Sequence, residues 1–225
     1  MHWQRLLADF APDILLLQET RHPSEYLEPD FYAANAGRFH WLPARDRAWG
    51  SAIYVRTGQL RPLALPQHSG YVVAAEHTGS DWSQRTGRPG HIVSLHVPAP
   101  YRRSMSEILD FTAAFADGRD LVLGGDFNLG VSVRHASELV ASDPPWLFRR
   151  LRREFNLINC WQTVHPNRDL AQTLRWARNP ATPYHCDGVF VPAAWYRHLE
   201  DCQVISDPVW NDLSDHNPVV VTLAG

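Results

Sequence analysis

The sequence predicts one layered α/β domain. Three observations carry this prediction: short apolar runs that resemble buried strands, stretches with helical spacing, and polar residues where several of the strands end. The chain has 225 residues, of which 44% are hydrophobic, so it can bury a substantial core. No repeat, low-complexity segment or interdomain linker is evident. We therefore expect a single domain over residues 1–225.

The expected elements follow one another along the chain. Apolar residues between Trp3 and Phe10 have helical spacing, and Pro12 ends this first helix. Strands are expected at Asp13–Leu17, Ser51–Val55, Tyr71–Glu76, His91–Val97, Leu121–Gly124, Asp187–Val191 and Pro218–Leu223. Further helices are expected at Ser104–Ala116 and Pro145–Phe155. Surface loops are expected at the proline-rich joints Arg61–Gly70, Val97–Tyr101 and Asn179–Tyr184.

Composition excludes several classes of protein. No apolar stretch is long enough to cross a bilayer, and the amino terminus lacks a signal-peptide pattern. Three cysteines without a CxxC pair predict neither a disulfide framework nor a structural zinc site, so we expect a cytoplasmic location. The formal charge of −3 argues against non-specific coating of nucleic acid, but it is compatible with a nuclease. All basic residues are arginine, which we ascribe mainly to genome composition.

The stretch from Leu123 to Asn128, Leu-Gly-Gly-Asp-Phe-Asn, is the most informative motif. A buried strand carries straight into two glycines, Asp126 and Asn128, which places a carboxylate and an amide on a loop where active sites gather. The glycines would let the backbone turn sharply and let a substrate approach closely. The same residues would suit an ordinary turn, because Asp and Asn favour turns.

Other strand ends also carry polar residues that a core would not accept. They are Glu19, His96, Asp187 and the pair Asp215-His216. Together with Asp126 and Asn128, they predict one acidic pocket that contains imidazoles. Carboxylates and an amide suit Mg²⁺ or Mn²⁺, and a hard cation beside a general base is what phosphoester hydrolysis needs.

These residues carry a family resemblance. Gln18-Glu19, Gly-Gly-Asp126-Phe-Asn128, the late Asp187 and Ser-Asp215-His216-Asn-Pro occur in the order seen in the endonuclease/exonuclease/phosphatase superfamily, which includes exonuclease III and deoxyribonuclease I. Gly50-Ser-Ala-Ile, Trp161-Gln-Thr-Val-His-Pro and Thr173-Leu-Arg-Trp176 are similar to further segments of that family. The resemblance covers Pro12 to Leu223 and implies a four-layer α/β/β/α sandwich of two mostly antiparallel or mixed sheets.

The resemblance also implies residue roles. Glu19 would be the principal metal ligand, with Asp215 at or near the metal. Asp126 would transfer the proton that activates water or serves the leaving oxygen, and Asn128 would orient the scissile phosphate.

Three more roles concern the phosphate and the substrate. His216 would contact a phosphate oxygen, with Asp187 holding its tautomer, and His96 would donate to the phosphate or protonate the leaving group. Trp176, with Arg175 beside it, is the candidate substrate contact, since aromatic rings can stack on bases.

One segment departs from the family pattern. Family members begin with a strand that ends in Asn, whereas this sequence begins at Met1-His2-Trp3, inside the first expected helix. We therefore expect the fold without its first strand. An upstream start, which the intact motifs favour, and a degenerate member with impaired catalysis are the two hypotheses.

The leading functional prediction is a divalent-metal-dependent phosphoesterase, a nuclease that hydrolyses DNA and acts as a monomer without a membrane or an obligate protein partner. One alternative is a phosphatase or phosphodiesterase for a small or lipid-derived phosphate, which the lack of a basic stripe keeps open. The other is a catalytically impaired binding protein that retains the fold.

Overall fold

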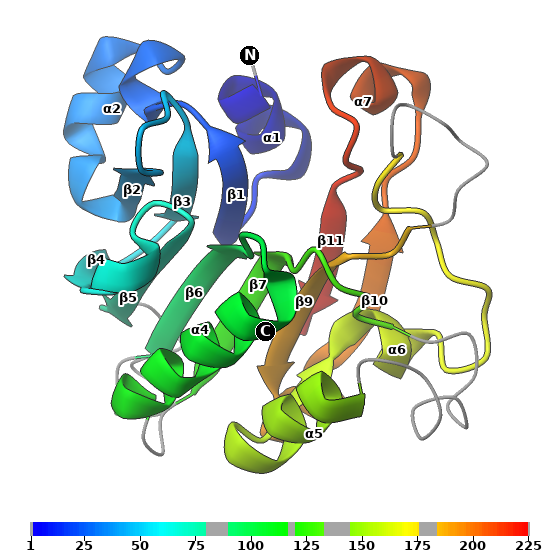
Figure 1. The fold of residues 1–225 in the computed structure, drawn as a ribbon. Coiled ribbons are helices and arrows are strands. Elements are labelled where there is room, and N and C mark those ends of the chain that lie inside the picture. The colour runs from blue at the N-terminus through cyan, green and yellow to red at the C-terminus, as the bar shows by residue number, and fades with distance from the viewer. Residues whose placement is uncertain (1, 80–89, 117–119, 133–144, 176–183, 225) are drawn as a thin grey trace. The chain divides into compact units, whose positions relative to one another are not determined.

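The computed structural model describes residues 2–79, 90–116, 120–132, 145–175 and 184–224. It has a mixed α/β fold in which several β-sheets are flanked by helices, as the sequence predicts (Figure 1). The chain forms two compact units, Met1–Gly125 and Asp126–Gly225. No helix among the described residues is both long and apolar enough to span a membrane.

The first unit contains strands of two sheets. Its helices and strands are α1 (His2–Phe10), β1 (Ile14–Thr20), α2 (Pro29–Ala34), β2 (Phe39–Pro43), β3 (Gly50–Val55), β4 (Gln59–Leu63), β5 (Val72–Thr78), β6 (Gly90–His96), α4 (Tyr101–Phe115) and β7 (Leu121–Asp126). One sheet has the order β1-β3-β2, and β4, β5, β6 and β7 follow one another in the other. Strands β1 and β3 pack against β5 and β6.

Alternation along β3 explains why its sheet is covered on both faces. Ile53 and Val55 join a core cluster with residues of β5 and β6, between the two sheets. Ala52 and Tyr54 point the other way, into a cluster with Trp3 of α1. This is the period of two expected for a strand, and it confirms that the apolar run is a strand with two buried faces.

The second unit supplies the remaining elements. They are α5 (Pro145–Glu154), β8 (Leu157–Asn159), α6 (Cys160–Val164), β9 (Asp187–Pro192), β10 (Leu199–Val204), α7 (Pro208–Leu213) and β11 (Val219–Leu223). Strand β8 pairs with β9 and β10 pairs with β11, both antiparallel. A core cluster around Cys160, Val191 and Cys202 joins α6 to these strands.

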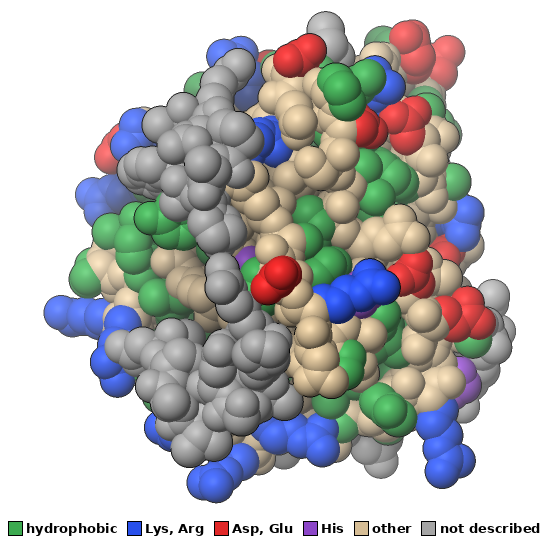
Figure 2. Space-filling view, turned by 90° about the vertical axis from the view of Figure 1, so that its right-hand side faces the viewer, with side chains coloured by type: hydrophobic (Ala, Val, Ile, Leu, Met, Phe, Trp, Pro, Cys, Tyr) green, Lys and Arg blue, Asp and Glu red, His purple; other side chains and the backbone are tan. Residues whose placement is uncertain are grey.

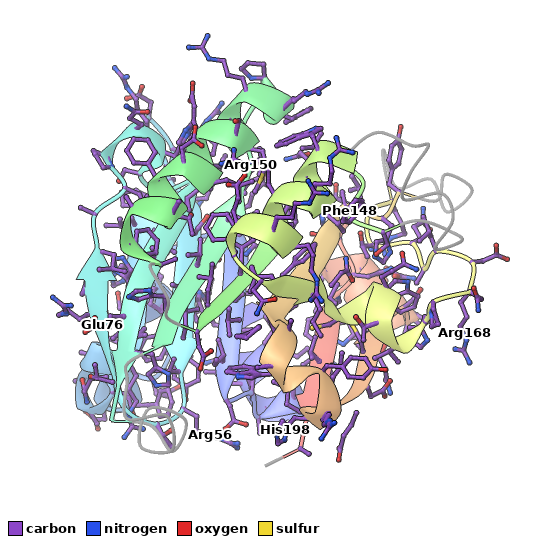
Figure 3. All side chains as sticks on the ribbon, turned by 90° about the horizontal axis from the view of Figure 1, so that it is seen from below. Arg56, Glu76, Phe148, Arg150, Arg168 and His198 are labelled. Atoms are coloured by element: carbon purple, nitrogen blue, oxygen red, sulfur yellow. The ribbon has the colours of Figure 1, made fainter. Side chains whose placement is uncertain are left out.

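Helix α5 confirms the expected division into a core stripe and a solvated face. Leu147 and Leu151 are buried, while Arg152 and Arg153 are exposed. Arg150 forms an ion pair with Glu154 one turn further along, at 2.8 Å (Figure 3).

The expected loop Arg61–Gly70 is wrong at its start, because Arg61 to Leu63 form the second half of β4. Proline lacks an amide hydrogen, but among the described residues β4 is the first strand of its sheet and pairs with β5, so Pro62 occupies an edge where this loss is tolerated. The short strands β2, β8 and β10 and the short helices α2, α6 and α7 are not predicted from the sequence. The loop predicted at Asn179–Tyr184 lies outside the described residues except for Tyr184.

Candidate active site

Asp126 is the last residue of β7, where the sequence suggested a loop, and Asn128 lies in the turn that follows it. Asp126 is 5% exposed, and the backbone amide of Asn128 donates to its Oδ1 at 2.8 Å. Asn128 has a left-handed backbone with φ of 50°. Asn tolerates this conformation better than most residues, which explains an amide side chain at this position.

Gly125 has a φ of 134°, which confirms the sharp turn. A Cβ atom there would lie 2.1 Å from the carbonyl oxygen of Leu95 in β6 and 2.7 Å from the side chain of Gln18. The close approach is therefore made by a neighbouring strand and a glutamine, where the sequence suggested a substrate.

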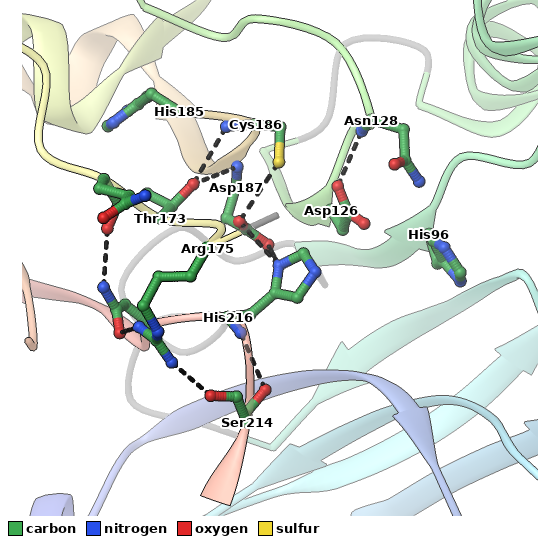
Figure 4. A network of polar contacts seen from close by, with 12 residues as sticks. His96, Asp126, Asn128, Thr173, Arg175, His185, Cys186, Asp187, Ser214 and His216 are labelled. Carbon is green, nitrogen blue, oxygen red and sulfur yellow. Dashed lines mark hydrogen bonds and ion pairs between the residues drawn. The ribbon is translucent and has the colours of Figure 1, made fainter. Parts of the chain in front are cut away.

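Asp187 and His216 form a hydrogen-bonded pair in the second unit (Figure 4). Nδ1 of His216 lies 3.1 Å from Oδ1 and 3.0 Å from Oδ2 of Asp187. The Asp187 side chain is 12% exposed and that of His216 is 33% exposed. The carboxylate thus fixes the ring through one nitrogen and leaves the other nitrogen for a ligand.

Thr173 fixes the start of β9. Its hydroxyl oxygen is buried and accepts hydrogen bonds from the backbone amides of Cys186, at 3.0 Å, and Asp187, at 3.1 Å. The backbone amide of Phe127 donates to the carbonyl of Cys186 at 2.9 Å. The turn after β7 and the first residues of β9 are therefore held side by side.

Arg175 fixes the loop that carries Asp215 and His216. Its guanidinium donates from Nη1 to Oδ1 of Asn217 and from Nη2 to the carbonyl of Ser214. Its backbone amide donates to the carbonyl of Asp215 at 2.8 Å. Arg175 is only 6% exposed, so these contacts make it a positioning residue for the loop, and its predicted contact with substrate stays a prediction.

The electrostatics of the second unit raise the pKa values of Asp126 and His216. Burial, with the nearby charge of Asp187, raises the pKa of Asp126 to about 7. Burial alone would lower the pKa of His216, but the hydrogen bond to Asp187 and the negative charges of Asp187, Asp126 and Asp215 outweigh it and raise that pKa to about 9. A carboxyl group that titrates near neutral pH suits general acid–base catalysis.

The first unit holds Glu19 beside His96. The register of β1 against β3 shifts between Leu17 and Thr20, and Glu19 has a left-handed φ of 51°. Such a bulge turns a side chain out of the regular alternation, and the Glu19 side chain is 62% exposed. Its Oε1 lies 3.7 Å from Nε2 of His96.

A side-chain contact between sheets secures this bulge. Gln18 donates from Nε2 to the hydroxyl of Ser94 in β6 at 2.9 Å, and that hydroxyl lies 3.3 Å from the carbonyl of Leu17. Gln18 was noticed in the sequence only as the neighbour of Glu19.

Comparison of the sequence with protein-family models identifies the family of this chain. The model described as "Endonuclease/Exonuclease/phosphatase family" matches residues 2–216. The chain belongs to this family. Membership supports a phosphoric-ester hydrolase, and members of the family are generally dependent on divalent metals. A comparison with curated proteins finds none that matches.

Solved structures share the family fold. The 3′ phosphatase NExo from Neisseria, bound to a product DNA hairpin, matches with a TM-score of 0.68 and 20% identity over 100% of this chain and 93% of that one. An AP endonuclease from Archaeoglobus fulgidus matches with a TM-score of 0.64 and 17% identity over 96% of this chain and 91% of that one. The endonuclease domain of TRAS1, a telomere-specific non-LTR retrotransposon, matches with a TM-score of 0.62 and 19% identity over 97% and 88% of the two chains.

For this member of the endonuclease/exonuclease/phosphatase family, the roles of the individual residues stay predictions. Glu19 lies in the first unit and Asp215, which is exposed, lies in the second, so their joint binding of one metal ion remains a prediction. Trp176 lies outside the described residues. Sequence reasoning missed Cys186, whose thiol lies 3.6 Å from Oδ2 of Asp187, and it gave no separate role to Thr173.

Proposed function

We propose that this protein hydrolyses phosphodiester bonds of DNA with the help of Mg²⁺ or Mn²⁺. The observation that carries the proposal is the hydrogen-bonded Asp187–His216 pair beside the buried Asp126, in a chain that belongs to a family of phosphoesterases. A phosphate and an attacking water need a proton acceptor, a hydrogen-bond donor and a positive charge, and these side chains supply the first two.

Asp126 is the proposed proton-transfer group. With a pKa of about 7, its carboxylate takes a proton from water and can return it to a leaving oxygen without a large energetic mismatch. Because the amide of Asn128 holds Oδ1, the carboxylate has a fixed orientation.

His216 and Asn128 are the proposed phosphate-binding groups. His216 donates from the ring nitrogen that does not face Asp187, and the Asp187 carboxylate stabilises the charged ring. The side-chain amide of Asn128 donates to a second oxygen of the phosphate. His96, beside Glu19, is proposed to donate to the phosphate or to the leaving group.

The metal would be held by carboxylate oxygens. The exposed carboxylates of Glu19 and Asp215 are hard oxygen donors, which fits Mg²⁺ or Mn²⁺. When bound, the ion would neutralise the charge that develops on the phosphate.

DNA is proposed as the substrate because the matched 3′ phosphatase is described with a product DNA hairpin. Acidic and basic side chains both occur on the face shown in Figure 2, so on that face individual arginines would contact the DNA backbone. We propose that Trp176 stacks on a base and that the protein acts as a monomer.

The test is a substrate panel with purified protein in Mg²⁺ or Mn²⁺. Abasic-site duplex, nicked duplex, DNA with a 3′ phosphate and a small phosphodiester are compared, with and without EDTA. We expect turnover of at least one DNA substrate, abolished by EDTA and by Asp126→Ala.

Other outcomes would redirect the proposal. Turnover of the small ester alone would contradict DNA as substrate and favour a small-molecule phosphodiesterase. Binding of DNA without any turnover would contradict hydrolysis and favour a non-catalytic binding protein.

A further inference from the structure

A mixed cluster of sulfur, oxygen and nitrogen ligands lies within the proposed active site. Cys186, Asp187 and His216 each offer one ligand atom, and these atoms all lie within 4.8 Å of one another. Sγ of Cys186 lies 3.6 Å from Oδ2 of Asp187, and that carboxylate oxygen lies 3.0 Å from Nδ1 of His216. The proposed magnesium chemistry makes no use of the thiol.

The spacings within this cluster resemble those around a tetrahedral ion. Zinc binds sulfur at about 2.3 Å and nitrogen or oxygen at about 2.0–2.1 Å, so neighbouring ligand atoms around it lie roughly 3.3–3.5 Å apart. The sulfur–oxygen distance of 3.6 Å and the nitrogen–oxygen distance of 3.0 Å are each within a few tenths of an ångström of this spacing. The three ligand atoms all lie within 4.8 Å of one another, so none of these separations would have to shorten by more than about 1.5 Å to seat an ion.

A fourth ligand is close to the same thiol. The Asp126 carboxylate is within hydrogen-bonding reach of Cys186. The backbone around the cluster is fixed, since the amides of Cys186 and Asp187 both donate to Thr173. The site is therefore largely organised before any ion binds, and the side of the His216 ring, 33% exposed, offers a way in.

We propose that Cys186, Asp187 and His216 bind a thiophilic divalent ion such as Zn²⁺, and that this ion inhibits the protein. A thiolate with an imidazole selects zinc-like ions over Mg²⁺, which prefers oxygen ligands and keeps its waters. On binding, the S–H bond of Cys186 and one N–H bond of the protonated His216 ring break, both protons pass to the solvent, and the freed sulfur and nitrogen lone pairs form the bonds to the metal.

Inhibition follows from the shared ligands. An ion held by Asp187 and His216 replaces the hydrogen bond between them, so the ring no longer has the tautomer and orientation that phosphate binding requires. The proposed binding of the ion is independent of the proposed function. The proposed inhibition rests on the proposed function.

The binding test uses Co²⁺ as a spectroscopic substitute for Zn²⁺, with the full chain under reducing conditions. Cys186→Ser is the test variant, and Cys160→Ser is the matched control because Cys160 is buried in the same unit but belongs to the core cluster with Cys202. We expect a near-ultraviolet thiolate-to-cobalt band at one ion per chain in the wild type and in Cys160→Ser, lost in Cys186→Ser and displaced by Zn²⁺.

The inhibition test measures Mg²⁺-supported hydrolysis as Zn²⁺ is added, each variant normalised to its own rate without Zn²⁺. Cys186→Ser should need at least about tenfold more Zn²⁺ for half inhibition than Cys160→Ser, since loss of even an outer partner of a metal ligand weakens binding 10- to 100-fold.

If the wild type showed no thiolate-to-cobalt band, the proposed site would be wrong, and this result does not depend on the stability of any variant. Persistence of the band in Cys186→Ser would also overturn the site. A normal band with equal Zn²⁺ sensitivity in both variants would overturn inhibition through this site. A protein that binds cobalt as expected but hydrolyses nothing with Mg²⁺ alone would contradict the proposed function and leave the metal site supported.

Discussion

The ring of His216 faces both carboxylate oxygens of Asp187, with Nδ1 at 3.1 Å from Oδ1 and 3.0 Å from Oδ2. This contact joins the first residue of β9 to the loop before β11. It sets the tautomer of the imidazole and supplies the negative charge that, against burial, keeps the pKa of His216 raised.

Asp187→Asn should therefore lower kcat more than it changes KM. Asn can still accept from Nδ1, but it carries no charge to stabilise a protonated ring, so we expect a fall in kcat of about 10²–10³-fold, as for loss of one preorganised donor. Steady-state kinetics on the best DNA substrate measure it. Asp212→Asn, the same change at an exposed residue of α7, should stay near wild type. Equal activity of the two variants would remove Asp187 from the mechanism.

Arg175→Met should loosen the loop that carries Asp215 and His216. It leaves Oδ1 of Asn217 and the carbonyl of Ser214 without their donor, so the free energy of unfolding should fall by at least about 1.5–3 kcal/mol, the usual value of a hydrogen bond to a charged group.

Urea unfolding measures the effect, and Arg168→Met is the control because Arg168 is exposed at the surface (Figure 3). If both variants unfold at the same urea concentration, the buried guanidinium does not hold the loop.

Gly125→Ala should be among the most damaging small substitutions. Its φ of 134° is unfavourable for any side chain, and the new Cβ would meet the carbonyl of Leu95 at 2.1 Å. Backbone strain alone costs about 1–3 kcal/mol, and the collision adds to it.

Thermal unfolding checks this against Gly130→Ala, where an added Cβ meets nothing within 4 Å and the change should stay within about 0.5 kcal/mol. Similar melting temperatures for the two variants would mean that the turn after β7 is not constrained as described.

Buried histidines should make the fold sensitive to acid. Burial lowers the pKa of His77 below its ordinary value of 6.5, although the hydrogen bond to Thr57 opposes the shift. The unfolded chain therefore takes up a proton at His77 first, so the stability that neutral His77 contributes is present above about pH 6.5 and is lost as the pH falls below it.

His77→Gln should remove up to about 1.4 kcal/mol per pH unit from the slope of stability just below pH 6.5, the value for one proton. Urea unfolding at several pH values measures that slope. His198→Gln, at an exposed histidine, should leave it unchanged. A slope that is the same in His77→Gln and wild type would contradict a neutral buried ring.

The local pattern of hydrophobic residues predicts the buried strands well and the edge strands poorly. Side chains of β3 alternate between two core clusters, so the strand is a nearly continuous run of hydrophobic residues. The length of this run predicts the length of the strand. Strand β4 can contain Pro62 and the charged Arg61 because it is an edge strand, and nothing in the local sequence says that a strand lies at an edge.

The residues of the candidate site also divide into those that local sequence predicts and those that depend on tertiary contacts. The motif around Asp126 was visible because glycines, an acid and an amide follow an apolar run. The bulge that turns Glu19 outward depends on the register of β1 against β3 and on Ser94 in β6, which are tertiary contacts. The thiol of Cys186 could not be placed beside Asp187 without the geometry of β9, because strand neighbours ordinarily point to opposite faces.

The most direct measurement is the single-turnover rate of DNA cleavage in Mg²⁺ by the wild type and by Asp126→Asn. The substitution keeps the size of the side chain and removes its ability to accept a proton. The proposed proton transfer predicts a rate at least about 100-fold lower for a variant that unfolds like the wild type. A folded Asp126→Asn protein that cleaves DNA within tenfold of the wild-type rate would contradict it.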